Sequence, residues 1–235
     1  MAEKDDKLPA PGTRSDIDAF LAKVAVTPVM KPADERGRLI FAMDATASRE
    51  PTWDQACHIQ GEMFTATSGL GGLDVQLVFY RGFGECRASP WSTNSEDLVR
   101  RMTAVSCLGG HTQISRVLGH AITETKKRPV DALVFVGDCI EEDIDELCAL
   151  AGELGLLSVP AFMFHEGMDP AAERGFKQIA RLTNGAYCRF DAGSAGQLRE
   201  LLSAVAVYAA GGKRALEDYG KKTGGMVRQI TSQVK

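Results

Sequence analysis

The chain has 235 residues, 44% of them hydrophobic, and a formal net charge of −4 at pH 7. This length and composition suffice for one sizeable core, and the acidic balance argues against a general nucleic-acid-binding protein. No run of 18 apolar residues predicts a membrane span, and the polar start, MAEKDDKLPAPG, lacks the apolar core of a secretory signal. We therefore expect a cytoplasmic protein.

The cysteines and histidines are scattered through the sequence and give no metal-binding spacing. None of the six cysteines forms a C-x-x-C pair, and the four histidines form no H-E-x-x-H or similar motif. Zinc sites need clustered ligands of these types. We therefore expect reduced, mostly buried thiols of the kind found in cytosolic proteins.

The first 37 residues are Pro-rich and charged, which predicts an N-terminal arm that is partly disordered. Within it, the spacing of the apolar residues in DIDAFLAKVAV, residues 16–26, is typical of a short helix. Pro28 and Pro32 would end this helix.

From residue 38 to residue 210, apolar strand patterns alternate with helical ones. Strands are predicted over residues 38–43, 73–82, 84–89, 130–138, 159–167 and 186–190, and helices over residues 51–69, 94–105, 112–127, 141–155, 170–185 and 194–210. Such alternation indicates a mainly parallel sheet covered by helices on both faces. Ligand sites in these sheets lie at the carboxyl ends of the strands, where the strand order reverses.

The last 25 residues, 211–235, differ in character from the segment before them. They contain two Gly pairs, few large apolar residues, and six basic against two acidic side chains. We expect a basic, flexible C-terminal tail, with a short amphipathic helix around Met226 to Ile230 as an alternative.

Three predicted loops carry oxygen ligands of the kind that Mg²⁺ prefers. Asp44, Thr46 and Ser48 follow the first strand in the stretch D-A-T-A-S, Thr112 follows a Gly-Gly pair, and Asp138 ends a buried strand. Carboxylate and hydroxyl oxygens are hard ligands. The alternative for each loop is ordinary helix capping by the same side chains.

The order of these motifs resembles the von Willebrand factor A (VWA) family, here in its intracellular bacterial form, over residues 38–210. The resemblance implies a three-layer α/β/α sandwich with a doubly wound, Rossmann-like sheet, and a metal-ion-dependent adhesion site (MIDAS) of the form D-x-T-x-S. It assigns the metal to Asp44, Thr46, Ser48, Thr112 and Asp138. The chain departs from the family at two positions, with Thr46 where Ser is common and Cys139 where Gly often follows the aspartate.

By this resemblance, we expect an adaptor domain rather than an enzyme. A bound Mg²⁺ or Mn²⁺ would keep an open position that an Asp or Glu of a partner protein completes. One alternative is a structural or interaction domain that works without metal. The other is a haloacid dehalogenase-like phosphatase, but that family resemblance requires D-x-D, and position 46 is Thr. Neither a G-x-G-x-x-G loop after the first strand nor a Walker lysine is present.

Overall fold

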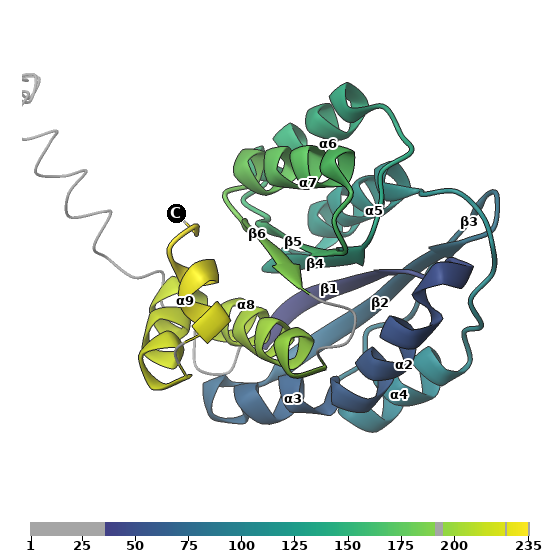
Figure 1. The fold of residues 1–235 in the computed structure, drawn as a ribbon. Helices are drawn as coiled ribbons and strands as arrows, with labels where there is room; N and C mark the ends of the chain where they lie inside the picture. Colours follow the sequence, from purple (N-terminus) through teal and green to yellow (C-terminus); the bar gives the residue numbers. More distant parts are fainter. Residues whose placement is uncertain (1–35, 191–194, 224, 235) are drawn as a thin grey trace, which may run out of the picture. The chain divides into compact units, whose positions relative to one another are not determined.

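A computed structural model describes residues 36–190, 195–223 and 225–234 (Figure 1). The predicted N-terminal arm and its short helix therefore lie almost wholly outside the described residues. Among the described helices, none combines the length and the apolar character needed to cross a membrane.

The described strands form one six-stranded sheet in the order β3-β2-β1-β4-β5-β6. Every neighbouring pair is parallel except β2 and β3, which form an antiparallel hairpin. The strands are β1 (Gly37–Asp44), β2 (Leu73–Arg81), β3 (Glu85–Ala88), β4 (Ala132–Gly137), β5 (Ala161–Glu166) and β6 (Ala186–Phe190). Because the chain moves outward from β1 to β2 but returns to the other side for β4, the strand order reverses between β1 and β4.

Helices cover both faces of the sheet, as the alternation of strands and helices predicts. One face carries α2 (Glu50–Ile59), α3 (Gly61–Thr67), α4 (Ser95–Thr103) and α8 (Ala195–Thr223). The other face carries α5 (Ile114–Lys127), α6 (Ile144–Leu156) and α7 (Pro170–Leu182). The predicted α/β/α sandwich with a doubly wound, mainly parallel sheet is confirmed.

The central strand β1 shows how its sequence produces the two layers. Side chains alternate across a strand, so Leu39, Phe41 and Met43 pack into the core beneath α2 and α8. Ile40 and Ala42 pack into the core beneath α5. An unbroken apolar run therefore fits a strand that is buried on both faces.

The C-terminal residues differ from the flexible tail expected from composition. Helix α8 continues to Thr223 with a break at Gly212, whose φ is 69°, and α9 spans Gly225–Thr231. Leu216, Val227 and Ile230 are buried in the core beneath α8. Helix α9 agrees with the alternative of a short helix around Met226 to Ile230, whereas composition alone does not indicate the continuation of α8 beyond Ala210, which tertiary packing stabilises.

Candidate metal centre

The candidate centre lies where β1 and β4 end side by side. Met43 is paired with Val136 in the parallel ladder, so Asp44 and Asp138 lie side by side at the carboxyl ends of their strands. Gly137 keeps the two chains close: a Cβ at this position would lie 2.7 Å from the Phe135 ring and 3.8 Å from Cβ of Asp44. The structure thus brings together two aspartates that lie 94 positions apart in the sequence.

The first loop forms a continuous polar chain from Asp44 to Asp138. The Thr46 backbone N–H donates to Oδ1 of Asp44 at 2.7 Å. Oγ1 of Thr46 lies 3.4 Å from Oγ of Ser48, which in turn donates to Oδ2 of Asp138 at 3.2 Å. The alternate residues of D-A-T-A-S therefore point to one side and meet the third loop.

Thr112 is attached to the third loop rather than directly to the two aspartates. Its backbone N–H donates to Oε2 of Glu141 at 2.8 Å, and its Oγ1 accepts from the Glu141 N–H at 3.0 Å. The second loop also reaches the first, because the Leu108 N–H donates to the Ala45 carbonyl at 3.0 Å. Gly110 is required in this loop, since a Cβ there would lie 2.0 Å from the carbonyl oxygen of Gly82.

The helix-capping alternative can be compared with the observed caps. Helix α2 follows Arg49 and receives no side-chain cap hydrogen bond. Helix α5 is preceded by Gln113, and its free Ile114 and Ser115 N–H groups donate to Glu142 of the third loop. Helix α6 is capped by Asp143. The five predicted metal ligands therefore cap none of the three helices that follow their loops.

Both aspartates keep one buried oxygen that accepts no hydrogen bond of normal geometry among the described residues, although the Tyr80 hydroxyl lies close enough to interact with the Asp44 carboxylate. These oxygens are Oδ2 of Asp44 and Oδ1 of Asp138. Asp44 is only 1% exposed, and its burial raises the pKa of its carboxyl group, to which the nearby Asp138 charge adds. A buried carboxylate oxygen without a donor is costly. A divalent cation would satisfy both oxygens, so the residues present fit such an ion.

Two further charged residues, which the sequence analysis did not single out, belong to the same cluster. Arg49 is 2% exposed, bonds Oε2 of Glu166 through Nη2, and places Nη1 at 3.7 Å from Oδ2 of Asp138. Thr52 also donates to Oε2 of Glu166 at 2.5 Å. Glu166 ends β5 as Asp44 ends β1, so an acid at a strand end was the signal that could have found it.

Cys139 and His111 are sequence neighbours of the predicted ligands Asp138 and Thr112. Burial, followed by the charge of Asp138, raises the pKa of Cys139 to about 12, so its thiol is neutral at pH 7. His111 is exposed, and its Nδ1 lies 3.2 Å from Oε1 of Glu141. The described part of the chain contains no group of three or more His, Cys, Asp or Glu side chains arranged for a metal. Asp44 and Asp138 are the two acids of the predicted ligand set, and hydroxyls make up the rest of it.

The fold is similar to VWA domains in solved structures. The VWA domain of SpRpn10 has a TM-score of 0.55 at 15% identity, covering 72% of this chain and 94% of that domain. PTMP1 from the mussel byssus, with a zinc-occupied MIDAS motif, has a TM-score of 0.61 at 14% identity, covering 82% and 52%. The vWF domain of Mfa5 from Porphyromonas gingivalis has a TM-score of 0.56 at 11% identity, covering 74% and 95%.

No protein-family model matches the sequence, and no match is found among curated proteins. At these identities, the likeness to solved structures shows the shared fold.

Proposed function

We propose that this protein is a metal-dependent protein-interaction domain. Asp44, Thr46, Ser48, Thr112 and Asp138 hold Mg²⁺ or Mn²⁺, and a carboxylate of a partner protein completes the coordination. The observation that carries this proposal is the pair of buried aspartate oxygens without hydrogen-bond partners, at neighbouring strand ends beside the hydroxyls of Thr46 and Ser48. The zinc-occupied MIDAS of PTMP1 supports divalent binding on this fold.

The charges of the cluster suit a partner that presents an acid. Asp44, Asp138 and Glu166 carry three negative charges, and Arg49 balances one of them. A divalent cation would neutralise the remaining two, so an incoming carboxylate meets no excess of negative charge. When bound, the cation supplies an electrophilic position, which Mg²⁺ readily fills with an oxygen ligand. The protein side chains hold and orient it.

The same edge of the molecule exposes apolar side chains that a protein partner would cover. Phe83 is 83% exposed in the β2–β3 turn, Leu108 is 48% exposed in the second loop, and Met168 is 76% exposed after β5. Leu108 is tied to the first loop through Ala45. Exposed apolar groups around a polar centre are typical of protein-interaction sites.

Metal binding is tested by calorimetry with Mg²⁺ and Mn²⁺ on chelator-stripped protein. We expect binding heat and a raised melting temperature, both lost in Asp44→Asn because a neutral oxygen removes the Coulomb attraction. The matched control is Asp145→Asn, which makes the same charge change at an exposed position on α6. Absence of heat and of a thermal shift up to several millimolar metal would reject the metal centre.

Partner binding is tested by capture with and without chelator, using intact protein and Asp44→Ala. If the cation bridges the two proteins, chelation and removal of the partner's acid cost similar affinity, and their effects do not add. Undiminished capture by Asp44→Ala in chelator would instead favour an interaction domain that works without metal.

We further propose that the domain is not an enzyme and that it works in the cytoplasm. Thr46 stands where a haloacid dehalogenase-like phosphatase would need a second carboxylate for proton transfer. Aryl-phosphate turnover that disappears in Asp44→Asn would overturn this part of the proposal. All six cysteines are free, which suits a reducing compartment.

A further inference from the structure

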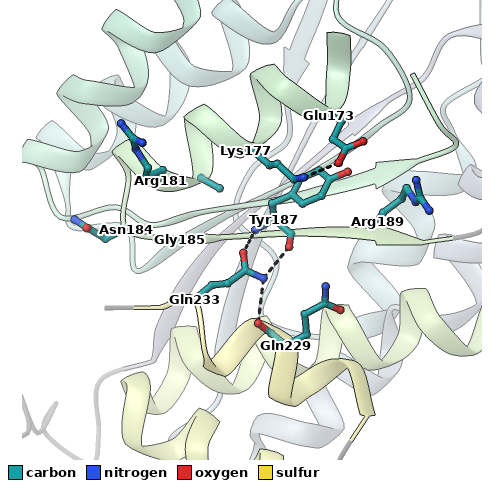
Figure 2. Close-up of a pocket in the computed structure, with 10 residues that line it drawn as sticks. Glu173, Lys177, Arg181, Asn184, Gly185, Tyr187, Arg189, Gln229 and Gln233 are labelled. Carbon is teal, nitrogen blue, oxygen red and sulfur yellow. Dashed lines mark hydrogen bonds and ion pairs between the residues drawn. The ribbon is translucent and has the colours of Figure 1, made fainter. Parts of the chain in front are cut away.

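A cavity of about 710 Å³ lies between α7, β6 and α9, away from the candidate metal centre (Figure 2). Lys177 and Arg181 of α7 line one side, Tyr187 and Arg189 of β6 form the floor, and Gln229 and Gln233 close the other side. Figure 2 shows Arg181 and Arg189 toward opposite ends of this groove, with Tyr187 between them. We call this cavity the β6 groove.

The β6 groove carries an excess of positive charge. Lys177 is neutralised by Glu173, with Nζ at 2.5 Å from Oε1, and it also lies 5.2 Å from the centre of the Tyr187 ring. Arg181 and Arg189 are exposed, and neither forms an ion pair with an acid in the described part of the chain. Neither guanidinium group is held in a direct ion pair, although Arg189 also interacts electrostatically with Glu173, and each can bind a carboxylate through two parallel hydrogen bonds.

The floor of the groove is the outer edge of the sheet. The Tyr187 N–H donates to Oε1 of Gln233 at 2.8 Å, and Nε2 of Gln233 donates to the Tyr187 carbonyl at 3.0 Å (Figure 2). One side-chain amide thus replaces one residue of a missing neighbouring strand. Because strand groups alternate with a period of two, the Arg189 N–H and carbonyl face the same edge. No described strand pairs with β6 on this side.

Arg189 connects the β6 groove to the candidate metal centre. It also lines a neighbouring cavity of about 560 Å³, whose walls include Ser48, Asp138 and Arg49. A ligand that enters beside Ser48 and Asp138 would therefore meet Arg189 next, and beyond it the open edge of β6. Arg189 lines both cavities and Arg181 lies toward the other end of the β6 groove, so the exposed positive groups along this path are Arg189 and Arg181.

We propose that the β6 groove binds an extended, acidic segment of the partner protein, which continues from the carboxylate at the candidate metal centre. Acids at alternate positions of an extended chain lie on one side, roughly 6.6 Å apart, and so follow a line of arginines. Arg189 and Arg181 pair with these acids, and the open edge of β6 offers main-chain hydrogen bonds. The inference extends the proposed function to the partner's sequence, but the charge of the groove does not depend on metal.

The test uses the full chain and a fluorescein-labelled peptide of about ten residues with Glu at alternate positions, long enough to span roughly 33 Å when extended. Fluorescence anisotropy is measured at low salt in Mg²⁺ and again in chelator. We expect Arg181→Glu and Arg189→Glu each to weaken binding roughly tenfold in both buffers, because each reverses a charge that faces the peptide. Both side chains are exposed, so the variants should fold.

The matched control is Arg174→Glu, an exposed position on α7 outside the groove. It should leave peptide binding within about twofold of the unchanged protein. An equal loss in this control, or equal binding of a peptide with Gln in place of Glu, would overturn the proposal. Equal competition by a single-stranded oligonucleotide of the same charge would overturn the choice of an acidic protein segment.

The measurements in Mg²⁺ and in chelator distinguish binding in the β6 groove from binding through the metal. Binding that resists chelator but falls in the Arg181 and Arg189 variants would support the groove and reject the metal bridge for this peptide. Binding that chelator abolishes and the two arginine variants leave unchanged would reject the groove and keep the metal centre.

Discussion

Two kinds of aspartate lie at the same edge of the sheet, and they differ in how their oxygens are satisfied. Asp143 caps α6 by accepting from two backbone N–H groups, and Asp169 caps α7 in the same way through one. Asp44 and Asp138, at the ends of neighbouring strands, each keep a buried oxygen that accepts no hydrogen bond of normal geometry among the described residues. A capping aspartate therefore stabilises the fold, whereas an aspartate with an unsatisfied oxygen is available to a ligand.

The buried ion pair of Arg49 and Glu166 should stabilise the fold, as the capping aspartates do. Arg49→Met would leave Glu166 as an uncompensated buried charge, so we expect a loss of about 3–5 kcal/mol in the free energy of unfolding, measured with urea. The double variant with Glu166→Gln should recover much of this loss, since it removes both charges. Equal stability of the single and double variants would contradict a coupled pair.

Removing the cap of α6 should have the next largest effect. Asp143→Ala deletes the acceptor of the Asp145 and Glu146 N–H groups, and we expect a loss of about 1–2 kcal/mol. Metal binding should not change, because Asp143 lies outside the predicted ligand set. A loss of metal affinity in this variant, measured by calorimetry, would contradict the separation of capping aspartates from metal-binding ones.

In the absence of metal, Asp44→Asn should raise the free energy of unfolding, whereas the two changes above lower it. The change removes a buried charge but keeps an oxygen to accept from the Thr46 N–H, so chelator-stripped protein should gain roughly 1 kcal/mol. The same variant should show no thermal shift with Mg²⁺. Destabilisation in chelator would mean that the Asp44 charge is already compensated by the protein.

The contact of Gln233 with the outer strand β6 satisfies backbone groups in the way that the capping aspartates do. Gln233→Ala leaves the Tyr187 N–H and carbonyl without a protein partner, and we expect a loss of about 1 kcal/mol. Amide hydrogen exchange at Tyr187 should become faster in this variant. Unchanged exchange would show that the side-chain amide does not protect this edge.

The smallest expected effect concerns pH and His120. Burial lowers the pKa of His120, whose Nε2 lies 2.8 Å from Oε1 of Gln76. The unfolded chain, with a His pKa of about 6.5, therefore takes up the proton first, and stability is lost as pH falls below that value. In His120→Gln, unfolding curves between about pH 7 and pH 5 should show a shallower decline.

The sequence by itself was enough for the order of strands and helices and for the loops that bear Asp44, Thr46 and Ser48. These features depend on local signals, since unbroken apolar runs predict buried strands and helical spacing predicts the covering helices. The doubly wound sheet followed from their alternation, and with it the expectation that strand ends would carry the site.

Only the tertiary structure decided which polar groups are satisfied and by what. Glu142 caps α5 from a different loop, and Arg49 meets Glu166 across 117 positions, because adjacent strand ends bring distant segments together. The residues after Ala210 fold because their few apolar side chains find a core that other elements provide. Local composition carries no information about such partners, so it predicted a flexible tail where Gln233 bonds the Tyr187 backbone at the edge of β6.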